Sequence, residues 1–207
     1  MAVLTARRIR RLGVLDLSVL DEVGTDPRAT LPSLAVAGGS TFLLGLGGWL
    51  WWITSGLGDS RTVLLKSVFI GSLFSLALWL AWLVVVYVVL QRLADTVINV
   101  ERLVRAAGMA TAPLSLGLLM VIPGISFGIG IVAVGAWALT TQAAIERATG
   151  ISGRPVLIAN AAGFAVWALA MSVLATSTNQ IAPGPFLAES IWEAVTTFNY
   201  SEVVLGS

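Results

Sequence analysis

Few side chains of this sequence have the chemistry of a catalytic or metal-binding site. The sequence contains no cysteine and no histidine, which excludes disulfides, thiolate nucleophiles, zinc sites of the Cys/His type and a haem held by histidine. Glu101 and Glu146 are both expected near one membrane surface, where paired carboxylates could transfer protons or bind a metal. Solvated charges at helix ends are the simpler interpretation, so we assign no catalytic, cofactor-binding or metal-binding residue and expect a protein that is not an enzyme.

The polar side chains inside the long apolar stretches are uncharged. Charged residues within a membrane usually mark ion paths or proton relays, so this pattern argues against a proton-coupled pump or an ion channel with a charged filter. Gln142 and Asn160 could meet across two neighbouring helices near the cytoplasmic surface. Hydrogen bonds between helices explain such residues more simply than substrate binding does.

The composition is that of a membrane protein. Of the 207 residues, 57% are hydrophobic and 11% are charged, whereas about a quarter of the residues of soluble domains are charged. So much apolar surface requires lipid as its solvent. The net charge of +1 gives no general attraction to nucleic acid. We therefore expect an all-α, polytopic helix bundle in contact with membrane lipids.

The stretch 106–144 carries no charged residue. As one straight helix it would be about 60 Å long, roughly twice the hydrocarbon thickness of a bilayer, so it must fold back on itself. Proline ends or kinks a helix, and Pro123 and Gly124 near the middle mark the turn of this hairpin. Pro113 is expected to bend the first of its two helices. Gly124 and Gly128 form a G-x-x-x-G pair, which favours close helix packing.

The hydrophobic pattern predicts five membrane spans, the first of them rich in small residues that let helices approach closely. Their expected ranges are 33–54, 67–90, 106–122, 124–145 and 156–176. The spans form a transmembrane domain over 32–177. A cytoplasmic amphipathic segment, 1–31, precedes it, and an outer tail with a short amphipathic helix, 178–207, follows it.

Two segments outside the spans are expected to form helices at the membrane surface. Helical spacing in the N-terminal segment predicts one apolar face formed by Ile9, Leu12, Leu15, Val19 and Val23. The segment 91–105 is expected to continue the second span into the cytoplasm or to lie on the membrane. Its apolar side would be formed by Leu93, Val97, Val100 and Val104.

The basic residues predict the orientation of the chain. With five spans and a cytoplasmic N-terminus, Arg61 and Lys66 fall on the outer side. The other ten of the twelve basic residues fall on the inner side: Arg7, Arg8, Arg10, Arg11, Arg28, Arg92, Arg102, Arg105, Arg147 and Arg154. Because cytoplasmic loops carry the excess of Lys and Arg, this favours an inner N-terminus and an outer C-terminus. The preference for arginine over lysine is typical of a GC-rich bacterial genome, which indicates the bacterial cytoplasmic membrane.

Four short motifs give the sequence a family resemblance. They are G-M-A-T-A-P at 108–113, V-I-P-G at 121–124, A-W-A-L-T-T-Q-A at 136–143 and A-T-G-I-S-G-R-P-V at 148–156. With the order of five spans, they make the chain over roughly 33–176 resemble the Yip domain family, named for Ypt-interacting proteins. The resemblance implies a non-enzymatic five-span membrane protein of bacterial type. Eukaryotic members of that family are associated with vesicle trafficking and with Rab-type GTPases, so the resemblance also implies GTPase binding as a partner interaction.

Two classes of function are consistent with these observations. The first is a structural, scaffolding or interaction module, in its most specific form an accessory subunit that binds other subunits of a larger membrane complex. The second is a small transporter or lipid-handling protein. The third span, broken at Pro113, favours the second class, because interrupted helices can line a substrate site in the membrane.

Overall fold

The computed structural model describes residues 2–56, 60–122, 124–176 and 184, and all of their regular secondary structure is helical. The helices are α1 (Ala2–Gly13), α2 (Ser18–Thr25), η1 (Pro27–Ala29), α3 (Thr30–Thr54), α4 (Ser60–Val63), η2 (Leu64–Gly71), α5 (Ser72–Ala94), α6 (Val100–Met109), η3 (Ala112–Val121), α7 (Ser126–Thr149) and α8 (Arg154–Thr176). Among them η1 and η3 are 3₁₀ helices and η2 is a π-helix. The predicted all-α fold is confirmed for this part of the chain. The helix expected in the tail 178–207 lies outside the described residues, apart from Gly184.

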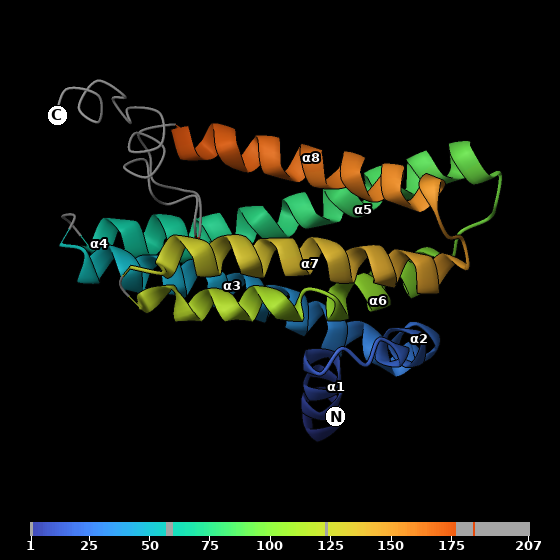
Figure 1. Ribbon diagram of the computed structural model, residues 1–207, viewed down its shortest axis with the longest axis horizontal. Helices are drawn as coiled ribbons and strands as arrows, with labels where there is room; N and C mark the ends of the chain where they lie inside the picture. Colours follow the sequence, from blue (N-terminus) through green and yellow to red (C-terminus); the bar gives the residue numbers. More distant parts are fainter. Residues whose placement is uncertain (1, 57–59, 123, 177–183, 185–207) are drawn as a thin grey trace, which may run out of the picture.

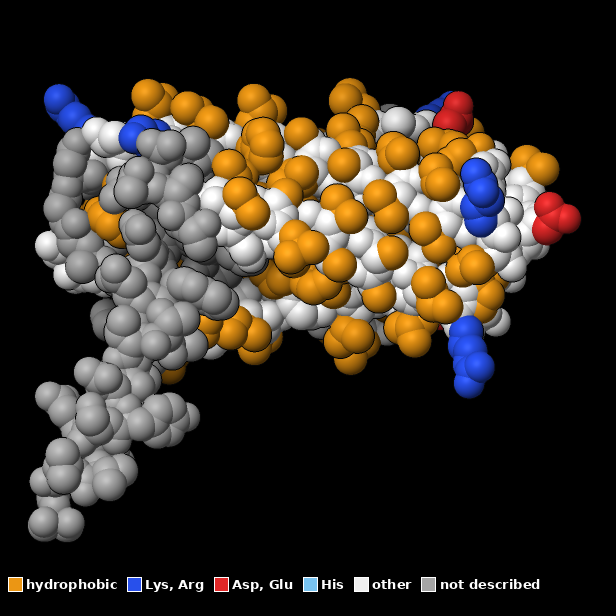
Figure 2. Space-filling view, turned by 90° about the horizontal axis from the view of Figure 1, so that it is seen from above, with side chains coloured by type: hydrophobic (Ala, Val, Ile, Leu, Met, Phe, Trp, Pro, Cys, Tyr) orange, Lys and Arg blue, Asp and Glu red, His pale blue; other side chains and the backbone are white. Residues whose placement is uncertain are grey.

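In the described part of the chain, five helical stretches are long and apolar enough to cross a membrane. They are Pro27–Thr54, Arg61–Ala94, Val100–Val121, Ser126–Thr149 and Arg154–Leu174. Large apolar side chains point outward from them, with Leu73 69%, Leu139 74% and Leu169 68% exposed. Figure 2 shows hydrophobic side chains along one face of the bundle and charged side chains toward its ends. Such a surface suits lipid rather than water, as in a multi-pass membrane protein.

The spanning helices lie side by side along one long axis (Figure 1). α5 packs against α8, α3 packs against α6 and η3, and α7 packs against η3 and α6. α2 and the turns at 95–99 and 150–153 lie at one end of the bundle, which we call the α2 end. α1 runs across the long axis (Figure 1), as a helix lying in a membrane surface would.

A tryptophan cluster fills the core where α5, α7 and α8 meet. Trp82 contacts Trp137 edge to face with ring centroids 4.7 Å apart, and Trp137 contacts Trp167 in the same way at 4.9 Å. Gly163 of α8 makes room for the first of these rings, because a Cβ on Gly163 would lie 1.9 Å from Trp82 Cδ1. Burial of large rings in this geometry favours the association of the three helices.

The third span changes helix type near Pro113. α6 ends at Met109, and the ten-residue 3₁₀ helix η3 continues the span from Ala112. Proline cannot donate the hydrogen bond that an α-helix requires at its position, and Pro113 lies in the first turn of η3. A 3₁₀ helix rises about 2.0 Å per residue, so η3 is roughly 5 Å longer than an α-helix of ten residues. The bend expected at Pro113 therefore takes the form of a change in helix type.

The N-terminal segment forms two helices instead of one. Leu15 has a φ of 61°, in the left-handed region, and this conformation interrupts helical structure between α1 and α2. Leu12, Val19 and Val23 are buried, but Leu15 is 78% exposed. The prediction of one continuous apolar face in this segment is therefore wrong, because the interruption changes the direction of the chain within it.

The segment 91–105 is not a single helix either. Asp95 ends α5 with a left-handed φ of 45°, and α6 begins five residues later as the first part of the third span. The side chain of Asn99 accepts a hydrogen bond from the backbone N–H of Arg102 and caps α6. Leu93 lies in α5 and Val100 in α6, so the single apolar side predicted for this segment is wrong.

Candidate functional site

An ion-pair network at the α2 end joins α1, α2 and η1, which together we call the N-terminal clamp. Arg8 is 5% exposed, and its Nη2 lies 2.9 Å from Glu22 Oε1 and 3.1 Å from Asp26 Oδ2. Arg11 lies 2.8 Å from the second oxygen of Glu22 and 2.9 Å from Asp16. A buried guanidinium requires such partners to compensate for its lost hydration. The network therefore holds α1 against α2 and the turn that follows it.

α2 packs in the core through three buried apolar side chains, Val19, Leu20 and Val23. In addition, α2 is attached to the bundle through one carboxylate and one backbone carbonyl. Asp21 pairs with Arg147 of α7 and lies 4.0 Å from Arg102 of α6. Arg105 of α6 is 5% exposed and donates from Nε to the carbonyl oxygen of Gly24 at 3.1 Å. Carbonyls in the last turn of a helix have no partner within the helix, and a cation there also interacts favourably with the helix dipole. Arg105 therefore caps α2 from another part of the chain.

The two carboxylates considered for acid–base chemistry each bond to a residue four positions away on their own helix. Glu101 Oε2 accepts a hydrogen bond from Arg105 Nη1 at 3.3 Å, and Glu146 Oε1 accepts one from Gln142 Nε2 at 2.9 Å. Such i,i+4 pairs stabilise helices. Within the residues that the structure describes, no group of three or more acidic side chains could hold a metal ion.

The N-terminal clamp lowers the pKa of three carboxyl groups, all outside the spans. A hydrogen bond from Ser18, followed by one from a neighbouring arginine, lowers the pKa of Asp16. A hydrogen bond from Arg8 and a backbone N–H lower the pKa of Asp26. Burial raises the pKa of Glu22, but hydrogen bonds from Arg8 and a second arginine outweigh this effect, and the net shift is downward. All three groups are thus stabilised in their charged form.

We predict that acid releases the N-terminal clamp. A carboxyl group whose folded pKa lies below its unfolded pKa stabilises the fold above the unfolded pKa, and this contribution is lost as the pH falls through the folded pKa. Because ordinary Asp and Glu pKa values are near 4, the clamp should be intact at pH 7 and loosen below about pH 4. Amide exchange of α1 and α2 should then increase relative to α8. Equal protection of α1 and α2 at pH 7 and about pH 3, corrected for intrinsic rates, would refute this.

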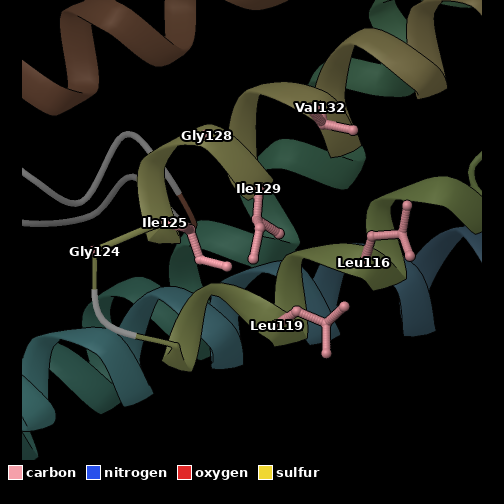
Figure 3. A pocket seen from close by; sticks show the side chains of 7 residues that line it. All are labelled: Leu116, Leu119, Gly124, Ile125, Gly128, Ile129 and Val132. Carbon is pink, nitrogen blue, oxygen red and sulfur yellow. The ribbon is translucent and has the colours of Figure 1, made fainter.

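The hairpin of the third and fourth spans carries an open apolar groove of about 480 Å³, which we call the hairpin groove. It is lined by Leu116, Leu119, Gly124, Ile125, Gly128, Ile129 and Val132. Figure 3 shows the side chains of Ile125, just before α7, and of Ile129 in α7 pointing toward η3, while Gly128 leaves the α7 backbone uncovered. An apolar surface of this kind in a membrane can receive a lipid chain or a helix of another protein.

Gly124 and Gly128 line the hairpin groove and do not lie at a contact between described helices of this chain. A Cβ on either glycine would meet no described atom within 4 Å. The close packing expected for the pair is therefore not found within the described chain, because their face of α7 is left open. Gly124 has a φ of 82°, a conformation that favours glycine in the hairpin turn. Pro123 lies outside the described residues.

Gln142 and Asn160 bond to different groups. Asn160 Nδ2 donates to the carbonyl oxygen of Ala138 at 3.1 Å, whereas Gln142 donates to Glu146 on its own helix. Asn160 thus joins α8 to α7 through the α7 backbone. Gln142 and Asn160 form no hydrogen bond with each other, so the direct contact expected between them is not found. Gln142 Oε1 and Asn160 Oδ1 are buried and accept no hydrogen bond from the described residues.

A very close contact between α3 and η3 occurs at Gly47 and Gly117. A Cβ on Gly47 would lie 1.9 Å from the carbonyl oxygen of Gly117, and a Cβ on Gly117 would lie 2.3 Å from Leu44 Cδ1. The small residues of the first span indicated such an approach, but sequence reasoning did not find Gly117 as the partner. The sequence also did not identify Arg105 as the cap of α2. Its position directly before the charge-free stretch 106–144 was the one sequence feature that could have indicated a special role.

Comparisons with known proteins identify no relative of this chain. No protein-family model, no curated protein and no solved structure matches it.

Proposed function

We propose that this chain is a non-enzymatic integral membrane protein that acts as a structural, scaffolding or interaction module, as an accessory subunit of a larger membrane complex. The hairpin groove is the observation that carries this proposal, since its glycine face is covered by no part of the described chain. Helices associate in lipid where small residues let their backbones approach. Gly128, with Gly135 two turns further along α7 and equally open, offers such a surface to a helix of another subunit.

The proposal includes a cytoplasmic N-terminus and a location in the bacterial cytoplasmic membrane. It is supported by the grouping of the basic residues, since the N-terminal clamp and the turns at 95–99 and 150–153 share the α2 end (Figure 1). The positive-inside rule favours the cytoplasm for that end. The motifs at 108–113 and 136–143 support a relation to the Yip domain family, but no contact of the described residues favours a GTPase as the partner.

Gly128→Leu should weaken association with the partner subunit. The added side chain enters open space, so the chain itself should fold as before, but the surface offered to a partner helix is blocked. Because an extra side chain forced into a packed contact costs about 1–3 kcal/mol, we expect roughly a tenfold loss of co-purified partner in mild detergent. Ala161→Leu, an exposed position on α8, is the matched control and should retain the partner. Equal recovery of the partner with both variants would contradict a role for the hairpin groove.

A small transporter or lipid-handling protein is the second candidate function. It is favoured by the change from α6 to η3 in the third span and by a further apolar groove that reaches Ala112 and Ser115 beside this change. Interrupted helices line substrate sites in many transporters. A ligand screen distinguishes the candidates, because a substrate should raise the melting temperature of a transporter whether or not a partner subunit is present.

A further inference from the structure

A second apolar groove lies between α1, α3 and η3, and we call it the α1–α3 groove. Its volume is about 700 Å³, and it shares no lining residue with the hairpin groove. It is lined by Ala6 and Ile9 of α1, by Gly39 and Leu43 of α3, and by Ala112 of η3. The groove therefore lies between a helix that crosses the bundle axis and two helical stretches of the bundle (Figure 1).

Arg28 lines the same groove and is exposed. Among the described residues, no ion pair involves its guanidinium, whereas Arg8, Arg11, Arg105 and Arg147 each pair with a carboxylate. The nearby Asp26 already accepts a hydrogen bond from Arg8 at 3.1 Å. The groove thus combines an apolar lining with an exposed cation that forms no ion pair within the described residues.

The apolar part of the groove has the depth of one lipid leaflet. Along α3 it extends from Pro32 to Leu43, eleven helical steps and so about 16 Å. Half of the hydrocarbon core of a bilayer is about 15 Å thick. Arg28 lies in η1, which leads directly into α3 at the start of this stretch. A cation at the depth of lipid headgroups and an apolar channel as deep as an acyl layer match a phospholipid in shape and charge.

We propose that the α1–α3 groove binds one anionic phospholipid from the leaflet at the α2 end. Its phosphate contacts Arg28, and one acyl chain lies over Gly39 toward Leu43 and Ala112. Guanidinium groups form strong charge-assisted hydrogen bonds with phosphate, and basic pockets between membrane helices bind anionic headgroups. This site goes beyond the proposed function and does not depend on a partner subunit, because all of its residues belong to this chain.

Two variants test the two halves of the site. Arg28→Gln removes the phosphate contact, and Arg92→Gln is its control, since Arg92 is an exposed arginine at the same end of the bundle and outside the groove. Gly39→Leu fills the acyl channel, and because a Cβ on Gly39 meets no atom within 4 Å, the variant should fold normally. Thermal unfolding without lipid checks that all variants are folded.

The purified full chain is titrated in detergent with phosphatidylglycerol and, separately, with phosphatidylcholine, and bound lipids are counted by native mass spectrometry. We expect one phosphatidylglycerol to bind saturably to the wild type and to Arg92→Gln, with about tenfold weaker binding to Arg28→Gln. Gly39→Leu should lose binding of both lipids at this site. Equal binding of phosphatidylglycerol by the Arg28 and Arg92 variants, or equal affinity of the wild type for both lipids, would overturn the proposal. Unchanged binding by Gly39→Leu would do so as well.

Discussion

Gly47→Ala should destabilise the helix bundle by about 3 kcal/mol, a large effect for one added methyl group. The new Cβ would lie 1.9 Å from the carbonyl oxygen of Gly117 and 2.6 Å from its carbonyl carbon. Both atoms belong to the backbone, so they cannot rotate away, and α3 or η3 must shift. Overpacking that moves the backbone costs about 1–3 kcal/mol and occasionally more. Thermal unfolding in detergent, followed by circular dichroism, measures the effect.

Gly39→Ala is the matched control for this substitution. Gly39 lies on the same helix, but a Cβ at this position meets no atom within 4 Å. Since alanine is favoured over glycine inside a helix by roughly 0.5–1 kcal/mol, Gly39→Ala should leave the melting temperature unchanged or raise it. A similar loss in both variants would show that the contact between α3 and η3 is not the cause.

Arg105→Met should weaken the attachment of α2 to the bundle while the spans remain folded. The substitution keeps most of the apolar stem but removes the donors to Gly24 O at 3.1 Å and to Thr30 Oγ1 at 3.4 Å. Hydrogen bonds to charged groups contribute about 1.5–3 kcal/mol, so local opening of α2 should become roughly 10- to 140-fold more frequent. Amide hydrogen exchange in α2, with α8 as the internal reference, measures this opening.

Arg92→Met controls for the loss of a positive charge at the same end of the bundle. Arg92 is exposed near the end of α5 and forms no ion pair with the described residues, so exchange in α2 should stay at the wild-type rate. If Arg105→Met left exchange in α2 unchanged, the cap of α2 would have no energetic role. If it raised exchange equally in α2 and α8, the effect would be global unfolding instead of local release.

The spans of this fold follow from the sequence because the thickness of the lipid core sets the length of each apolar helix. The charge-free stretch 106–144 is too long for one crossing, and it folds as the predicted hairpin with a turn at Gly124. Pro113 was identified as the place where the third span departs from a straight α-helix. In each case one physical constraint, either the bilayer thickness or the missing proline N–H, decides the local structure.

Other features depend on contacts that periodicity does not contain. Leu15 and Asp95 interrupt helical structure with positive φ values of 61° and 45°, although neither is a glycine. Arg105 caps a helix whose carbonyl lies 81 residues away in sequence. Gly128 belongs to a motif that indicates a packing face but not its partner, and its face of α7 is open in this chain. Long-range packing decides these positions, so the candidate sites could be predicted only in part.

The most direct test of the central claim is the native mass of the unaltered chain after purification from its own membrane in mild detergent. An accessory subunit should migrate in a defined large complex, with other membrane proteins present at fixed stoichiometry. Identification of each co-migrating chain by mass spectrometry would then name the subunits, and the one lost from Gly128→Leu would be the one that packs against the hairpin groove. A chain that migrates alone, as a monomer or a homo-oligomer, would contradict the claim and favour a lipid-handling module that acts by itself.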